Sequence, residues 1–126
     1  MLELFDGFIA AVATETHIPF KKEKDGHYFA NVEFEGGRHQ KVFVSLGEDE
    51  QGDPIIEYYS HVGSLPKKDA DLLYRLLETN LKLTYGAIAL KDDTIIIHQS
   101  YFLKTLDPER FLKSLVYVAA KADELE

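Results

Sequence analysis

The stretch Tyr85–His98, YGAIALKDDTIIIH, decides the fold because it reads as a strand, a tight turn and a second strand. A two-residue turn at Asp92-Asp93 places Leu90 opposite Ile95. Apolar residues run consecutively in both strands instead of alternating with polar ones. A hairpin at the surface of a small domain normally has one polar face. The sequence therefore raises the question of what covers the second face of this hairpin.

The predicted register sorts the hairpin side chains into two faces, because successive residues of a strand point to opposite sides. The expected core face consists of Ile88, Leu90, Ile95, Ile97 and Tyr101. The second face is half apolar and consists of Tyr85, Ala87, Ala89, Ile96, His98 and Phe102. Burial of an isoleucine or phenylalanine side chain contributes about 1.5–3 kcal/mol. Three interpretations stay open: a moderately apolar surface, cover by the chain's own third helix, or an interface with a second subunit or a bound polypeptide.

Three segments have the apolar spacing of helices. The first covers residues 2–14, and Pro19 ends it. Ser64 is expected to cap the second, with Pro66 in its first turn. The third begins in LDPERFL, where Asp107 is the expected N-cap. The expected buried residues are Leu2, Phe5, Phe8, Ile9 and Val12 in the first helix, Leu72, Leu73, Leu76, Leu77 and Leu81 in the second, and Phe111, Leu112, Leu115, Val116, Ala119 and Ala122 in the third.

Three further strands are expected between the first and second helices. Two of them alternate apolar and polar residues on either side of the turn EGGRH. A three-residue loop at 36–38 pairs Val32 with Val42 and sets Glu33 opposite Lys41. The segment IIEYYSHV is the third strand, and KKEKDG is expected to be a polar turn. The predicted order α-β-β-β-α-β-β-α indicates one α+β domain over residues 1–126, with an antiparallel sheet packed against helices.

Composition excludes several classes of function. The chain has a net charge of −8 and a pI near 5.1, which disfavours a nucleic-acid partner because such binding needs clustered lysine and arginine. It has no cysteine, so a disulfide framework or a thiolate zinc site is excluded. No window approaches the ~20 apolar residues of a membrane span. The N-terminus lacks the basic region of a signal peptide. We expect a soluble cytoplasmic protein.

Catalytic motifs are not recognisable in the sequence, and no cofactor or metal is expected. His39, His61 and His98 lie on predicted strands. If the strand order brings them together, they mark a pocket between the first helix and the sheet. The alternative function is therefore a small-ligand-binding or enzymatic domain with this pocket as its site.

Residues 72–126 resemble the YbjN-like family, which is part of the type III secretion chaperone-like superfamily. The matching features are the leucine-rich helix that ends near Asn80, Gly86 at the start of an apolar strand, the Asp92-Asp93 turn, the helix start Leu106–Glu109 and the ending Ala122-Asp123. The resemblance implies a compact α/β sandwich that often forms a homodimer. It also implies apolar grooves, around which the secretion chaperones wrap an extended segment of a secreted partner.

The sequence predicts a non-enzymatic protein-binding module, chaperone-like or regulatory. It holds a partner polypeptide or its own dimer mate by strand addition or by burial in an apolar groove. The candidate partner-binding residues are Leu4, Phe8, Tyr85, Ala87, Ala89, Ile96 and His98.

Overall fold

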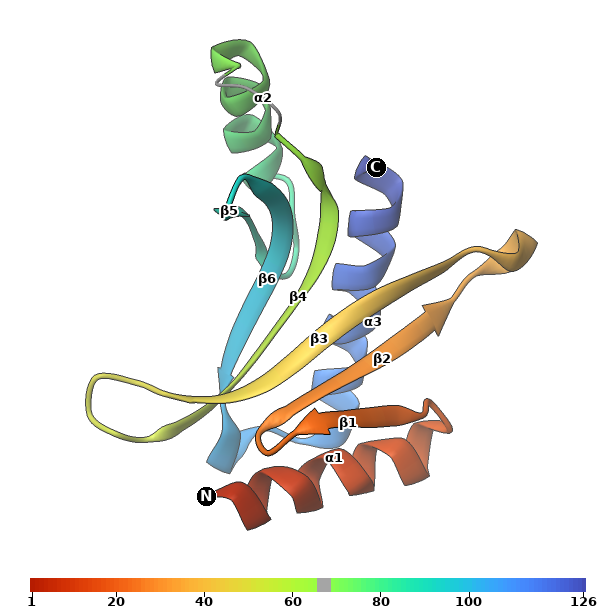
Figure 1. The fold of residues 1–126 in the computed structure, drawn as a ribbon, viewed down its shortest axis with the longest axis vertical. Helices are drawn as coiled ribbons and strands as arrows, with labels where there is room; N and C mark the ends of the chain where they lie inside the picture. Colours follow the sequence, from red (N-terminus) through yellow and green to blue (C-terminus); the bar gives the residue numbers. More distant parts are fainter. Residues whose placement is uncertain (66–68) are drawn as a thin grey trace.

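The computed structural model describes residues 1–65 and 69–126 (Figure 1). Its helices are α1 (Leu2–Thr16), α2 (Ala70–Asn80) and α3 (Pro108–Leu125). Its strands are β1 (Phe20–Lys24), β2 (His27–Glu33), β3 (His39–Glu48), β4 (Pro54–Ser64), β5 (Ala87–Lys91) and β6 (Thr94–Phe102). The fold class is α+β, as predicted, and the element order differs from the predicted one by one additional strand.

The additional strand is β1, which the sequence predicts as a polar turn. It pairs with β2 and forms one edge of an antiparallel sheet with the order β1-β2-β3-β4-β6-β5. Only Phe20 of this strand is partly buried, where it packs against the core. The remaining residues are exposed lysines and a glutamate. An edge strand with so little apolar alternation gives no period-two signal, so the prediction was wrong here.

The loop between β2 and β3 has the predicted length but begins one residue earlier, at Glu35–Gly37. Each strand residue consequently pairs with a partner two positions away from the predicted one, and the Val32–Val42 and Glu33–Lys41 pairs do not form. Both glycines of the loop have a positive φ, which explains why the reversal is centred on them. A shift of two residues leaves the two faces of the sheet unchanged.

The hairpin of β5 and β6 has the predicted register, with Leu90 opposite Ile95 and Ile88 opposite Ile97. Its turn is Asp92-Asp93, in which both residues have positive φ, 49° and 62°. Such a pair of left-handed residues forms a type I′ turn, which matches the twist of the flanking strands.

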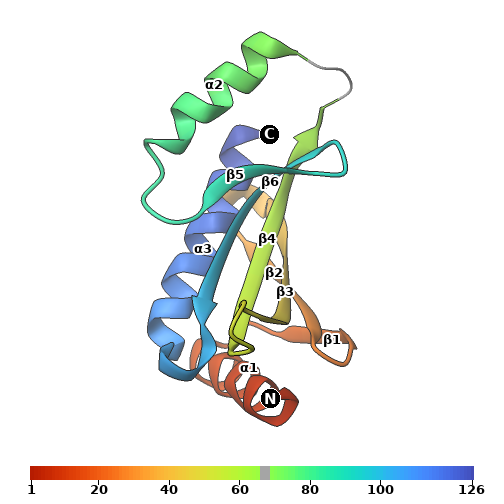
Figure 2. The ribbon, with the colours of Figure 1, turned by 90° about the vertical axis from the view of Figure 1, so that its left-hand side faces the viewer.

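Helices cover only one side of the sheet (Figure 2). The core there combines Phe5 of α1 and Phe111 of α3 with inward-facing strand residues such as Val44 and Ile56. The opposite side of the sheet carries no helix among the described residues, and we call it the open face. Because α3 lies on the core side, it does not cover the second face of the hairpin, and that interpretation is wrong.

β3 separates from β4 over residues 39–42, on the N-terminal side of Phe43, and this separation divides the sheet into two halves. β3 pairs with β4 only over the residues from Phe43 to Glu48, while β4 continues along β6. Figure 1 shows β3 and β4 close together near the loop that joins them and diverging away from it. Gln40 bridges the gap: its Nε2 donates to Ser60 Oγ at 2.9 Å and to the His61 carbonyl oxygen at 2.7 Å. Ser60 Oγ donates in turn to the Lys41 carbonyl oxygen at 2.7 Å.

The predicted helix caps differ in outcome. Asp107 is the N-cap of α3, and its carboxylate accepts from the Arg110 N–H at 2.8 Å. Asp69, not Ser64, caps α2. Ser64 instead ends β4, because it pairs there with a residue of β6. The prediction for Pro66 lies outside the described residues.

Candidate interaction surfaces

Side chains from five strands form one row across the open face. Because directly opposite residues share a face of a sheet, the row follows from the strand register. It runs through Phe29, Phe43, Tyr59, His98 and Ala87. The rings of Phe43 and Tyr59 are stacked, with centroids 5.2 Å apart. His61 lies 5.4 Å from Phe43 and 5.7 Å from Tyr59 between ring centroids. We call this set of residues, with His61, the aromatic row.

Two lysine side chains lie over the aromatic row. Lys41 Nζ is 4.0 Å from the centroid of the Phe29 ring and 5.0 Å from that of Phe43. Lys91 Nζ is 5.7 Å from the centroid of the Tyr59 ring. Such cation–π contacts contribute about 0.5–1 kcal/mol at exposed sites. They fix ammonium groups on an apolar platform that is open to a partner.

A hollow of about 740 Å³ lies on the open face beside the aromatic row. Ala89, Ile96 and His98, all predicted partner-binding residues, line it. Ile96 is buried at 6% exposure although it points away from the helices. Ala87 lies at the end of the aromatic row, opposite His98. The structure thus brings four of the seven predicted residues together on one surface.

The other three predicted residues lie elsewhere. Tyr85 packs edge-to-face against Tyr117 of α3, with ring centroids 5.3 Å apart. Gly86, with φ of 74°, turns the chain between Tyr85 and the strand, so the expected alternation does not extend to Tyr85. Leu4 is exposed on α1, whereas Phe8 is half-buried and packs against the core. These side chains do not join the aromatic row.

The predicted histidine pocket between the first helix and the sheet is not formed. His39, His61 and His98 all lie on the open face, whereas core side chains such as Phe5 fill the space under α1. Within residues 1–65 and 69–126, no group of three histidine, aspartate or glutamate side chains is placed to hold a metal ion. The pocket hypothesis was wrong because it put these histidines on the helix side of the sheet, whereas the hairpin register had placed His98 on the other face, where the structure has it.

A second apolar surface lies on α2 and β5, and the sequence prediction missed it. The helix has no buried residue, and Leu77 and Leu81 are 69% and 91% exposed. Leu90, predicted to face the core, is 50% exposed. Figure 1 shows that α2 extends beyond the end of the helical layer, so α3 does not cover it. We call this surface the α2–β5 patch; it comprises Leu73, Tyr74, Leu76, Leu77, Leu81, Ile88 and Leu90.

The two outer strands of the sheet carry features that discourage pairing with another strand. At β5, the side-chain amide of Asn80 replaces a neighbouring strand: its Oδ1 accepts from the Ile88 N–H at 2.5 Å, and its Nδ2 donates to the Ile88 carbonyl oxygen at 3.3 Å. At the other edge, β1 has the sequence FKKEK, and lysines on an edge strand discourage edge-to-edge pairing.

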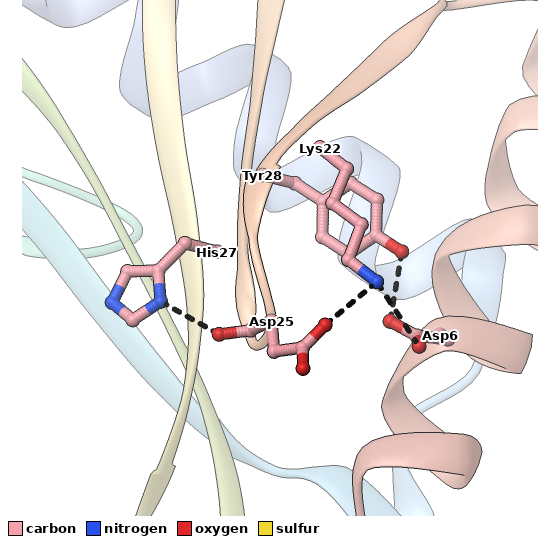
Figure 3. Close-up of polar contacts among 5 residues, drawn as sticks. All are labelled: Asp6, Lys22, Asp25, His27 and Tyr28. Carbon is pink, nitrogen blue, oxygen red and sulfur yellow. Dashed lines mark hydrogen bonds and ion pairs between the residues drawn. The ribbon is translucent and has the colours of Figure 1, made fainter.

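A polar cluster ties α1 to the β1–β2 hairpin (Figure 3). Tyr28 OH donates to Asp6 Oδ1 at 2.8 Å, and Lys22 Nζ lies 3.0 Å from Asp25 Oδ1 and 3.9 Å from Asp6 Oδ2. Burial, together with the hydrogen bond to Asp6, raises the pKa of Tyr28. The hydrogen bond to Asp25 raises the pKa of Lys22. Tyr28 and Lys22 hold their protons at neutral pH, and their contacts with Asp6 tie α1 to the hairpin.

The fold is shared with solved structures of protein complexes, one of which contains a type III secretion chaperone. The chain is similar to a chain of the HopA1–SchA chaperone–effector complex, with 9% identity, a TM-score of 0.68 and coverage of 98% of this chain and 94% of that one. The Yersinia pestis type III secretion chaperone SycH in complex with a stable fragment of YscM2 gives 17% identity, a TM-score of 0.60 and coverage of 95% and 98%. The ExsC–ExsE complex gives 13% identity, a TM-score of 0.63 and coverage of 98% and 92%.

These likenesses establish the secretion-chaperone fold predicted from the sequence. No protein-family model matches the chain, and no curated protein does. Among the helices that the structure describes, none has the length and apolar character needed to cross a membrane.

Proposed function

We propose that this chain is a non-enzymatic, chaperone-like or regulatory module that holds a partner polypeptide in the cytoplasm and forms a homodimer. The observation that carries the proposal is the aromatic row, which no helix covers in the described part of the chain. An apolar, aromatic surface of this kind gains free energy when a second polypeptide removes it from water. A polypeptide bound to the open face would cover the second face of the β5–β6 hairpin.

The two apolar surfaces suit different occupants. The α2–β5 patch is assigned to a second copy of the chain, because a two-fold contact uses the same patch on both subunits. Leu77 and Leu81 project from a helix that would pack against its symmetry mate. The open face is assigned to the partner polypeptide. The YbjN-like resemblance covers α2, β5, β6 and α3, and its implied homodimer agrees with this division.

The fold supports a protein-binding role by analogy. The HopA1–SchA structure is that of a chaperone with an effector, and the SycH structure is that of a chaperone with a fragment of YscM2. Of the two predicted binding modes, we propose burial on a face of the sheet over strand addition. The reason is that Asn80 occupies the edge of β5 and lysines protect the edge of β1.

Sedimentation velocity tests the dimer. We expect the wild-type chain to sediment as a dimer and the double variant Leu77→Glu/Leu81→Glu as a monomer, because each glutamate would be buried without a partner at the interface. Glu78→Lys, on the same helix, is the control and leaves the dimer intact. A wild-type chain that stays monomeric at high concentration contradicts the proposed dimer.

Binding of a reduced and alkylated, permanently unfolded protein tests the partner-holding role. We expect the wild-type chain to form a complex with it on size-exclusion chromatography. Phe43→Ser/Tyr59→Ser removes the stacked pair and weakens the complex, whereas Leu4→Ser, an exposed leucine of α1, does not. No complex with the wild-type chain, or equal binding by both variants, overturns the assignment to the open face.

A further inference from the structure

The open face lacks the acidic excess of the rest of the chain. The whole chain has a net charge of −8. Four lysines lie on this side, because each pairs with a residue of the open face or lines its hollow. They are Lys21, Lys24, Lys41 and Lys91. The glutamates there are Glu23, Glu33 and Glu57. Four of the five histidines of the chain lie on the same face, and they are His27, His39, His61 and His98. The acidic excess of the chain therefore lies away from the open face.

The two lysines over the aromatic row have no anionic partner. Among the described residues, the only lysines with a carboxylate oxygen within 4.0 Å are Lys22 and Lys121. Lys41 and Lys91 contact ring faces instead. An ammonium group carries three N–H donors, and a ring face on one side leaves donors free for a carboxylate. The positive charges are thus held in place but not neutralised.

The distant negative charges of the chain do not cancel this local excess. At physiological ionic strength, the interaction between exposed charges is largely screened beyond about 8 Å. A segment on the aromatic row therefore senses mainly the charges of the open face itself, where Lys41 and Lys91 lie over the row and the nearest carboxylates are those of Glu33 and Glu57. Neighbouring strands lie about 4.8 Å apart, so the row extends roughly 19 Å from Phe29 to Ala87. That length matches about six extended residues or about 13 helical ones.

We propose that the occupant of the open face is a short acidic and apolar segment of another protein. Its carboxylates pair with Lys41 and Lys91, while its apolar side chains lie on the aromatic row. This inference rests on the proposed partner-holding function and specifies the chemistry of the partner. The segment crosses the strands instead of extending the sheet, since the two outer strands carry features that discourage pairing with another strand.

Fluorescence anisotropy with two synthetic peptides tests the proposal. Both have about 14 residues and the same leucines and phenylalanines, and one carries glutamates where the other carries lysines. We expect the acidic peptide to bind about tenfold more tightly, and this advantage to shrink at high salt. Lys41→Glu/Lys91→Glu abolishes the preference. The control variant Lys82→Glu/Lys113→Glu makes the same change in net charge away from the open face, and it keeps the preference for the acidic peptide. Circular dichroism checks that both variants are folded.

The outcomes separate this inference from the proposed function. The proposal of an acidic segment is overturned by any of three results. These are equal affinity for both peptides, tighter binding of the basic one, and an unchanged preference in Lys41→Glu/Lys91→Glu. If neither peptide binds but the unfolded protein does, the proposal of an acidic segment is overturned and the proposed partner-holding function is retained. If the wild-type chain binds none of the three, both fall. A lysine variant that changes only the sedimentation coefficient assigns the open face to a second copy, which also overturns the inference.

Discussion

Gly86 occupies a position that no other residue fits. Its φ is 74°, and a Cβ atom there would lie 2.8 Å from the carbonyl oxygen of His98 and 3.3 Å from a methyl carbon of Ile97. A real Cβ does not approach a backbone oxygen so closely, and the left-handed conformation costs a residue with a Cβ about 1–2 kcal/mol. Gly86 thereby fixes both the start of β5 and the departure of Tyr85 from that strand.

We therefore expect Gly86→Ala to lower the free energy of unfolding by about 2–5 kcal/mol, from conformational strain together with overpacking. Gly7→Ala is the matched control, because Gly7 lies within α1 and a Cβ there meets nothing within 4 Å. That substitution is expected to raise the free energy of unfolding by about 0.5–1 kcal/mol. Urea denaturation measures both. A Gly86→Ala variant as stable as the wild type contradicts the described geometry.

Local chemistry explains which residue-scale predictions were right. The Asp92-Asp93 turn and the Asp107 cap depend on a few neighbouring residues, and both were confirmed. Ser114 was missed because a serine interrupts the apolar stripe of α3. It is buried because it accepts a 2.6 Å hydrogen bond from Tyr58 OH, a partner 56 positions away in the chain. No local pattern contains that information.

At the scale of elements, α2 shows the limit of periodicity. Its leucines have helical spacing, and the helix forms, but the stripe was predicted to be buried and is half exposed. Amphipathic spacing indicates that one side of a helix is covered, yet it does not say whether the cover belongs to the same chain. The α2–β5 patch was missed for this reason, whereas the open-face residues of β5 and β6 were found from a local register.

Asn80 joins α2 to β5, and its removal is expected to loosen both. Asn80→Ala leaves the N–H and carbonyl of Ile88 without their partner, so we expect a loss of about 1–3 kcal/mol in the stability of this unit. Hydrogen exchange of the Ile88 amide measures it directly. Asn31→Ala is the control, because the Asn31 side chain is exposed and makes no hydrogen bond in the described part of the structure. Unchanged protection of Ile88 in Asn80→Ala refutes the bridging role.

At the scale of the whole molecule, the fold class was predictable and the shape of the sheet was not. Element order and patterning restrict a chain to few layer arrangements, which is why the α+β assignment was right. The divergence of β3 from β4 depends on a long-range arrangement in which Gln40 reaches Ser60. The aromatic row likewise depends on the strand order, so the candidate site was only partly accessible from sequence.

The Gln40 bridge is expected to join the two half-sheets energetically. Gln40 is 6% exposed, and Gln40→Ala deprives the buried Ser60 Oγ and the His61 carbonyl oxygen of their donor. An unsatisfied buried polar group costs about 1–3 kcal/mol, so the midpoint of urea unfolding should fall clearly. Gln51→Ala, at an exposed loop position, should change stability by no more than about 0.5 kcal/mol.

The form of the transition separates two roles for this bridge. If Gln40 only fills space, Gln40→Ala lowers the midpoint while fluorescence and circular dichroism still report one transition. If it couples the halves, the two probes diverge, because β1-β2-β3 then opens before β4-β6-β5 does. We expect the two probes to report different transitions. The reason is that, on the N-terminal side of Phe43, β3 and β4 are joined by side-chain hydrogen bonds instead of a strand ladder. Coincident transitions in Gln40→Ala would show that α3, packed on β3, β4 and β6, is sufficient to keep the sheet cooperative.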